Sequence, residues 1–146
     1  MSAAMRAIAF ALALLTAPRV FAAEAKTIKV VYHFTGGLDQ SVAALRNVRN
    51  HLNAQPGVKI VVVANGDGID FLLDGAKDKN GNPFDVIVQE LSARNVEFRA
   101  CGNTLVARKV DRSKLIPEAK VVTSGVAEVA RLQAEEGYVY LRPRVR

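Results

Sequence analysis

Apolar and polar positions follow two alternating periods along the chain. Runs of β-branched and aromatic residues are typical of strands, and between them apolar residues recur at the spacing of amphipathic helices. The predicted strands cover residues 26–34, 57–66, 96–101, 120–124 and 138–143. The predicted helices cover residues 39–55, 68–75, 83–95, 103–108 and 124–137.

Strands that alternate with helices predict βαβ crossovers, which place parallel strands side by side and cover both faces of the sheet with helices. We therefore expect an α/β fold, a three-layer α/β/α sandwich with a mostly parallel sheet of about five strands. Asp39 or Ser41 is expected to cap the first helix and Ser124 the last, which Gly137 ends. In such sheets, ligands and reactive groups gather beyond the carboxyl ends of the strands.

The start of the chain has the pattern of a secretory signal peptide. A short segment with one basic residue, Arg6, precedes an uncharged run from Ala7 to Ala17, and Val20 and Ala22 are small residues before a cut. A membrane anchor is the alternative, but a spanning helix needs about 20 apolar residues. We interpret residues 1–22 as a cleavable signal peptide and residues 23–146 as one domain, so the mature protein is expected to be periplasmic or secreted.

No lipid anchor is expected either, because the sequence has no cysteine near the predicted cut. Removal of Arg6 and Arg19 lowers the basic count from 20 to 18 against 14 acidic residues, so the net charge falls from +6 to +4. The basic residues are dispersed and are not interleaved with aromatic ones, so no nucleic-acid partner is expected.

The chain contains one cysteine, Cys101, at the end of a predicted strand and directly before a predicted helix. A single cysteine cannot pair within its own chain, so in an exported protein it is either buried and inert or reactive. The start of a helix favours the thiolate over the thiol. Gly102 leaves room beside the sulfur, and Asn103 could cap the helix.

Two further residues are candidates for the same site. Arg99 would share a strand face with Cys101 and add a positive charge, and His33 follows the first strand to the same edge of the sheet, where it could act as a base or a hydrogen-bond partner. Alternatively, His33 only satisfies backbone groups. His51 is expected to be solvated on the outer side of its helix.

Common cofactor and catalytic motifs are missing from the sequence. The segment "GDGIDF" lacks the third glycine of a dinucleotide fingerprint, so no nicotinamide cofactor is expected. The two histidines and one cysteine lack the spacing of zinc ligands, and we expect neither a metal nor a cofactor. No Gly-x-Ser-x-Gly motif, Walker motif or pair of catalytic carboxylates is present.

Four segments resemble the exported branch of the DsrE/DsrF-like family, which is related to the TusD and YchN proteins, and the resemblance extends from about Lys26 to Pro143. They read "KVVYHFTGGLDQSVAALRNVRNHLNA", "KIVVVANGDGIDFLLDGAKDKNGNPF", "VQELSARNVEFRACGNTL" and "VVTSGVAEVARLQAEEGYVYLRP". The resemblance implies the fold expected above, assembled into trimers or hexamers. In the sulfur-relay members a cysteine at the end of the central strand carries sulfur as a persulfide, and the matching position is Cys101.

Two hypotheses about function follow. In the first, the protein is a sulfur carrier or a sulfurtransferase-like protein that acts through Cys101, with His33, Arg99 and Asn103 near the bound sulfur and with a protein or a small sulfur compound as donor and acceptor. In the second, it is a non-catalytic module for small-ligand binding or assembly, in which Cys101 has a structural role.

The last expectation is a homo-oligomer, a trimer or a dimer of trimers with Cys101 near a subunit boundary. Charged and apolar residues alternate along "VEFRA", which is unusual for a covered parallel strand, and the helix over residues 39–55 is apolar around more of its circumference than one buried stripe requires. Symmetric assembly is a common way to cover such surfaces.

Overall fold

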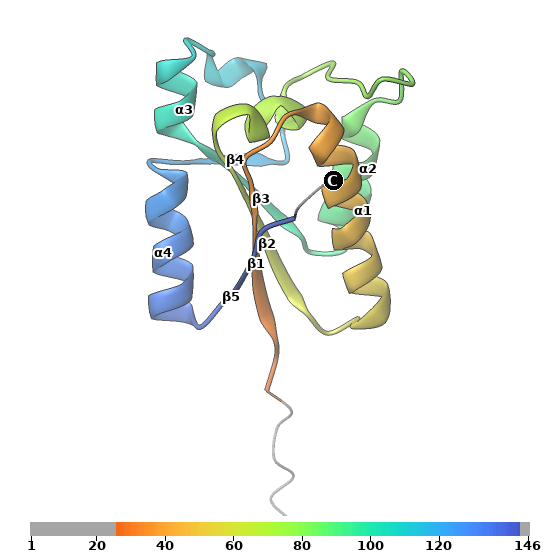
Figure 1. Cartoon of the computed structure of the whole chain (residues 1–146), viewed down its shortest axis with the longest axis vertical. Helices are drawn as coiled ribbons and strands as arrows, with labels where there is room; N and C mark the ends of the chain where they lie inside the picture. Colours follow the sequence, from red (N-terminus) through yellow and green to blue (C-terminus); the bar gives the residue numbers. More distant parts are fainter. Residues whose placement is uncertain (1–25, 144–146) are drawn as a thin grey trace, which may run out of the picture.

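A computed structural model describes residues 26–143, and these residues form an α/β sandwich (Figure 1). All five strands are parallel, and their order across the sheet is β4-β3-β2-β1-β5. The strands are β1 (Lys29–Phe34), β2 (Lys59–Ala64), β3 (Glu97–Cys101), β4 (Ala119–Val122) and β5 (Val139–Leu141). The predicted class, layer arrangement and strand number are confirmed.

Helices cover both faces of the sheet. In Figure 1, α1 and α2 lie to one side of the strands and α4 lies to the other, while α3 lies near the upper edge, where the strands end. The helices are α1 (Leu38–Ala54), α2 (Phe84–Ala93), α3 (Gly102–Ala107) and α4 (Gly125–Glu136), and the 3-10 helices are η1 (Gly66–Leu72) and η2 (Arg112–Lys114).

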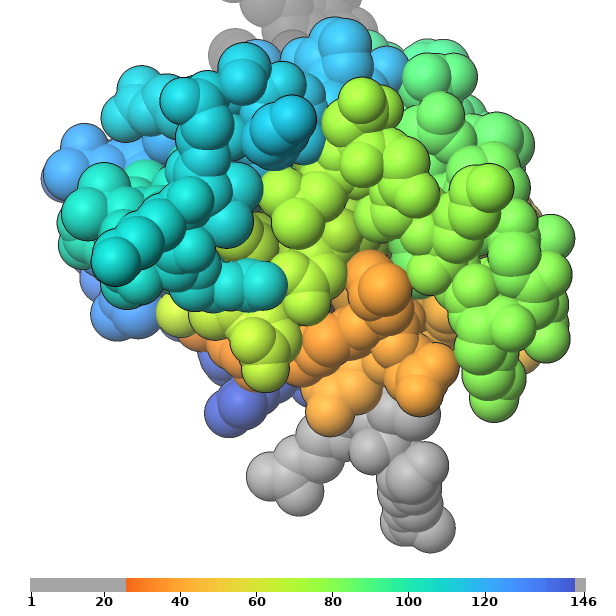
Figure 2. Space-filling model, turned by 90° about the horizontal axis from the view of Figure 1, so that it is seen from above, coloured from red at the N-terminus to blue at the C-terminus, as the bar shows by residue number. Residues whose placement is uncertain are grey.

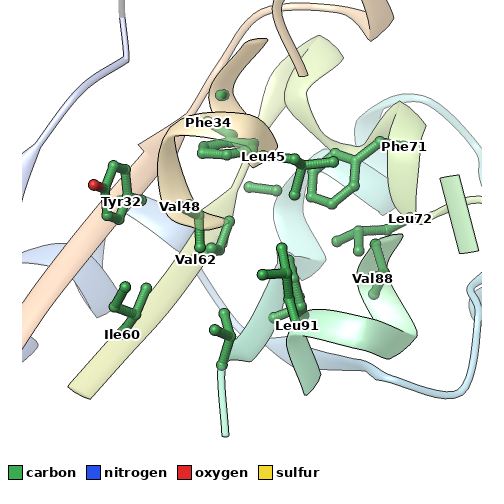
Figure 3. Packing of buried hydrophobic residues seen from close by; sticks show 14 of the residues in the cluster. Tyr32, Phe34, Leu45, Val48, Ile60, Val62, Phe71, Leu72, Val88 and Leu91 are labelled. Carbon is green, nitrogen blue, oxygen red and sulfur yellow. The ribbon is translucent and has the colours of Figure 1, made fainter. Parts of the chain in front are cut away.

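The larger core lies between the sheet and the helices α1, α2 and η1. Figure 3 shows this packing, in which Phe34 and Phe71 lie close to Leu45 and Val48 of α1. On the sheet side of this core, Phe34 and the other even-numbered residues of β1 and β2 are buried because they face α1 and α2. Their burial removes a continuous apolar surface from water, which is the main stabilising contribution to the fold.

The core on the α4 face is smaller. It contains Val31, Val61 and Val63 from the strands and three residues that pack on them: Val129, Leu132 and Tyr138. Odd-numbered residues of β1, β2 and β3 therefore face α4, and this parity continues to the strand ends. As a result, His33, Asn65 and Cys101 lie on the same face of the sheet, at its carboxyl edge.

The helix ends agree with the sequence in part. Ser124 caps α4, since its hydroxyl accepts the Ala127 N–H, and α4 ends at Gly137, where φ is 72°. The predicted cap of α1 by Asp39 or Ser41 is wrong. The helix begins one residue earlier, at Leu38, so Gly37 is the capping residue and the Ser41 hydroxyl instead donates to the Gly37 carbonyl.

His51 is not simply solvated, which corrects the expectation for this residue. It is partly buried on the inner edge of α1, where Nδ1 pairs with the Tyr32 hydroxyl at 2.9 Å and Nε2 with Gln55 at 3.1 Å. The hydroxyl of Tyr32 needs a partner because the ring beside it is buried in the core. We assign His51 this structural role.

Candidate functional site

The candidate site lies at the carboxyl edge of the sheet, around the sulfur of Cys101. Figure 2 looks onto this edge, where the surfaces of η1, α3 and the start of α1 meet. Cys101 is the last residue of β3 and the capping residue of α3, and it is 4% exposed. The chain turns directly from strand to helix at Gly102, where a Cβ atom would lie 2.9 Å from the Val122 carbonyl oxygen of β4.

Hydrogen-bond donors from two helices converge on this sulfur. The backbone N–H groups of Asn103 and Thr104 reach it from α3, and the N–H of Gly125 reaches it from the first residue of α4. The Thr104 hydroxyl is a fourth donor. Its oxygen accepts the Gly66 N–H at 3.0 Å, so its own hydrogen is available for the sulfur.

These donors determine the ionisation of the thiol. Burial acts to raise the pKa of Cys101, because a thiolate loses its hydration in the protein. The hydrogen bonds from Gly125, Thr104 and Asn103 outweigh this effect, and the pKa of the thiol is held below its ordinary value. Cys101 is therefore a buried cysteine whose surroundings favour the nucleophilic form.

His33, Asn65 and Tyr140 form a second polar group on the same face. His33 Nε2 donates to Asn65 Oδ1 at 2.8 Å, and the Tyr140 hydroxyl pairs with His33 Nδ1 at 3.0 Å. Burial lowers the pKa of His33, the hydrogen bond to Asn65 opposes this effect, and the charge of Arg142 adds to it, so the pKa stays below its ordinary value. The neutral ring then donates to Asn65 through Nε2 and accepts from Tyr140 through Nδ1.

Asn65 connects His33 with Cys101. It directly follows β2, and the pairing of Ala64 with Ala100 places it level with Cys101 on the neighbouring strand. A Cβ atom at Gly125 would lie 3.2 Å from the Cys101 Cβ and 3.3 Å from the Asn65 Cβ. The side chains of Asn65 and Cys101 therefore border the same small space, which Gly125 leaves open because it has no side chain.

Arg99 lies on the same strand face as Cys101, as its spacing predicts, but its charge is compensated. The guanidinium is bound by the carboxylates of Glu97 and Glu128, and its side chain is 16% exposed. The hydrogen bonds that lower the pKa of the Cys101 thiol come from Gly125, Thr104 and Asn103, and Arg99 is not among these groups. A direct role of Arg99 toward bound sulfur remains a prediction.

Asn103 does not cap α3, which corrects the predicted local geometry. The helix begins at Gly102, so Cys101 takes the capping position, no side chain caps the helix, and Asn103 lies one residue inside. Its side chain is exposed beside the site, and its backbone N–H donates to the Thr123 carbonyl at 3.1 Å while it also contributes to the lowered pKa of Cys101.

Sequence reasoning missed four residues of this site: Asn65, Thr104, Gly125 and Tyr140. Each lies near a helix start or on the last strand, and each meets Cys101 or His33 only when the strand order is known. The one available signal was the position of a residue just beyond a strand. In a parallel sheet, residues that follow neighbouring strands meet at the carboxyl edge, here beyond β2, β3 and β4. Within residues 26–143, no cluster of three or more His, Cys, Asp or Glu side chains could hold a metal ion.

Comparisons with known proteins agree with this geometry. The sequence model of the DsrE/DsrF-like family matches residues 3–143, a range that includes the whole described structure. The chain belongs to the DsrE/DsrF-like family. This family is linked to sulfur relay.

Two solved structures show the same DsrE-like fold. MTH1491 from Methanobacterium thermoautotrophicum, a protein of unknown function, is 34% identical with a TM-score of 0.70. The ychN protein from E. coli is 18% identical with a TM-score of 0.68, which supports the fold alone. In each case the alignment covers 80% of this chain and 99% of the other. A search of curated protein sequences gives no match.

The described part of this DsrE-like chain contains no helix that is long and apolar enough to cross a membrane. The predicted signal peptide lies outside residues 26–143, so the export of the protein remains a prediction.

Proposed function

We propose that this DsrE-like protein is a sulfur carrier that holds sulfane sulfur as a persulfide on Cys101. The observation that supports this most directly is the set of four hydrogen-bond donors around the sulfur, which come from Gly125, Thr104 and Asn103. Such a setting stabilises a thiolate both before sulfur is accepted and after it is released.

The proposed reaction is a thiolate exchange. The Cys101 thiolate attacks the outer sulfur of a persulfide donor, R–S–SH. A new S–S bond forms on Cys101, the S–S bond of the donor breaks, and R–S⁻ leaves with the electron pair while the proton stays on the transferred sulfur. Cys101 is oxidised from thiol to persulfide and the donor is reduced from persulfide to thiol, so no other oxidant is required.

Delivery to an acceptor reverses these steps. An acceptor thiolate attacks the outer sulfur, and Cys101 leaves as the thiolate that the helix N–H groups stabilise. Because Cys101 is only 4% exposed, we expect a slim donor such as a hydropolysulfide to react without rearrangement. Asn103 is exposed next to Cys101, so we expect a protein donor or acceptor to approach the sulfur on this side, where α3 begins.

Neighbouring side chains have secondary parts in this proposal. His33 is neutral and fixed, so it acts as a hydrogen-bonding group and not as a charge. Arg99 contributes through the position of β3 under α4, since its guanidinium is held by Glu97 and Glu128. With the predicted export signal, the carrier would operate outside the cytoplasm.

Intact mass measurement tests the proposal. The mature protein is incubated with inorganic polysulfide, desalted and weighed, and a gain of one sulfur atom is expected. Because Cys101 is the only cysteine, Cys101→Ser is a complete control and is expected to gain no sulfur. A wild-type protein without the adduct, or an adduct that persists in Cys101→Ser, would contradict the proposal.

The burial of Cys101 favours a second candidate, in which the protein binds or assembles without sulfur chemistry and the thiol only packs the core. This candidate predicts slow alkylation of the folded protein at every pH. The carrier predicts alkylation whose rate rises with pH through a midpoint below the ordinary thiol value. Measurement of the iodoacetamide reaction rate against pH separates the two.

A further inference from the structure

The Asn65 carboxamide uses its oxygen in a hydrogen bond with a side chain but not its nitrogen. Its Oδ1 accepts from His33 Nε2 at 2.8 Å, on the side of β1. Within residues 26–143, Nδ2 forms no hydrogen bond, and the Asn65 side chain does not cap η1, although Asn65 occupies its capping position. A planar carboxamide that turns its oxygen toward β1 turns its nitrogen away from it.

Cys101 lies on the other side of Asn65. The sheet order places β2 between β1 and β3, so the neighbour of Asn65 opposite His33 is the end of β3. Both Cβ atoms are within 3.3 Å of the point where a side chain at Gly125 would start. The Nδ2 group is thus an uncommitted side-chain donor that the end of β2 brings beside the cysteine.

The orientation of the Asn65 carboxamide is fixed by two residues that are distant in sequence, His33 and Tyr140. Asn65 Oδ1 can only accept, so the His33 ring donates to it through Nε2, and its Nδ1 then accepts from the Tyr140 hydroxyl. The two rings also meet edge to face, with centroids 5.8 Å apart. Tyr140 and His33 therefore hold the carboxamide with its nitrogen toward the site.

We propose that Asn65 binds the transferred sulfur directly, by donating from Nδ2 to the outer sulfur of the Cys101 persulfide, while His33 and Tyr140 are positioning residues that act through Asn65. This inference rests on the proposed sulfur-carrier function. It assigns different donors to the two sulfurs: main-chain N–H groups and Thr104 serve the inner sulfur, and Asn65 serves the outer one.

Sulfur loading at equilibrium is the measurement that reports on the outer sulfur. Wild type and variants are equilibrated with a fixed ratio of glutathione persulfide to glutathione, and the loaded fraction is read from intact mass. Asn65→Leu removes the donor without adding charge. We expect its loading constant to fall about fivefold, the value of one hydrogen bond between neutral groups. The thiol pKa of Cys101 should change little, because its own donors remain.

Two companion variants distinguish this role from a structural one. His33→Leu keeps the Asn65 nitrogen but frees the carboxamide to turn, so its loss should be smaller than that of Asn65→Leu. Asn53→Leu makes the same change at an exposed position in the last turn of α1, at the opposite edge of the sheet, and should load as wild type does.

The outcomes are separable. Equal losses in Asn65→Leu and His33→Leu would mean that Asn65 serves only to hold His33, which overturns the inference. Unchanged loading in a folded Asn65→Leu also overturns it, while leaving the carrier function intact. A wild-type protein that takes up no sulfur overturns the carrier function and this inference together.

Discussion

Cys101 shows how a buried thiol can remain ionisable without a neighbouring free cation. Most of the donors that face it are main-chain N–H groups at the starts of α3 and α4, and a single side chain, Thr104, adds a hydroxyl. Each donor alone contributes a modest amount, but hydrogen bonds to a charged group are stronger than those between neutral groups. Their sum exceeds the cost of burying the thiolate.

Substitution of Thr104 measures the share of the hydroxyl. Thr104→Val keeps the shape of the side chain and removes the donor, so we expect the thiol pKa of Cys101 to rise and the alkylation midpoint to move to higher pH. Thr104→Ser keeps the hydroxyl and is expected to retain the wild-type value. The rate of alkylation against pH, measured on all three proteins, reports the midpoint. A midpoint that does not move in Thr104→Val would show that main-chain groups alone lower the pKa.

The site residues that could be predicted from the sequence lie at the ends of predicted strands. Cys101 and His33 follow recognisable β runs, so their arrival at one edge of the sheet could be predicted. The cap assigned to Asn103 was wrong because the start of a six-residue helix shifts by one position without any change in the apolar pattern. Thr104 and Gly125 could not be found, since their role depends on the distance between two helix starts.

At the scale of elements, α4 is held to the sheet by charges as well as by its small apolar core. Arg99 of β3 binds Glu128 of α4, Glu128 also binds Arg131 at 3.0 Å, and Arg131 binds Glu136 at 2.8 Å. The alternation of charged residues in "VEFRA" therefore has a cause within one chain, because Glu97 and Arg99 face α4. This explanation removes one of the two reasons that the sequence offered for assembly.

Acid is expected to weaken this arrangement. Hydrogen bonds from Arg131, and then from Arg99, lower the pKa of Glu128 despite its burial, and Arg99 does the same for Glu97. A carboxyl whose pKa is lower in the folded state than in the unfolded state stabilises the fold above its unfolded pKa, and that contribution is lost as pH falls through the folded pKa. The free energy of unfolding, measured with urea, should therefore be lower at about pH 3 than at about pH 7. In Glu128→Gln this difference should be smaller. An equal loss in both proteins would contradict this assignment.

Removal of Arg99, the cation that Glu97 and Glu128 share, should also destabilise the fold. Arg99→Met leaves Glu97 and Glu128 facing each other with side chains that are 32% and 12% exposed. Arg131 still pairs with Glu128 and Lys120 with Glu97, so the two carboxylates stay partly compensated, and we expect the free energy of unfolding to fall by about 2 kcal/mol at neutral pH. Arg49→Met is the matched control, since its pair with Glu90 is about 40% exposed and contributes about 0–1 kcal/mol. Similar losses in the two variants would argue against a special role for the α4 contact.

Element boundaries were predictable where a residue imposes a conformation. Gly137 ends α4 because its left-handed φ suits glycine, and Pro83 directly precedes α2. The last strand is shorter than the predicted segment 138–143, because only Val139 to Leu141 pair with β1. Beyond Leu141 the chain is held by side chains instead, such as Arg142, which donates to Thr35 at 2.9 Å.

For the whole molecule, assembly remains a prediction. We expect a trimer or a dimer of trimers, and the exposed apolar side chains of the edge strand β5 support it: Val139 is 55% exposed and Leu141 37%. Sedimentation of the mature protein at micromolar concentration should give the mass of three or six chains. Val139→Lys should shift the distribution toward smaller species if this edge is the contact. A single monomeric species for the wild type would contradict the prediction.

The N-terminal segment supports a separate prediction about the location of the protein. Expressed from its full sequence in a Gram-negative host, the protein should appear in the periplasmic fraction with a new N-terminus near Ala23, because the small residues Val20 and Ala22 precede that position. A version that begins at Ala23 is the control and should stay in the cytoplasm. Recovery of uncut protein from the cytoplasm for both versions would contradict the export signal.

The pairing of β1 with β5 joins segments that lie far apart along the chain. Val31 of β1 pairs with Tyr140 of β5, and within residues 26–143 no other strand covers that side of β1. Because β2, β3 and β4 all precede β5 in the sequence, they are synthesised before it. One edge of β1 therefore stays open, and His33 lacks its tyrosine, until β5 has been made.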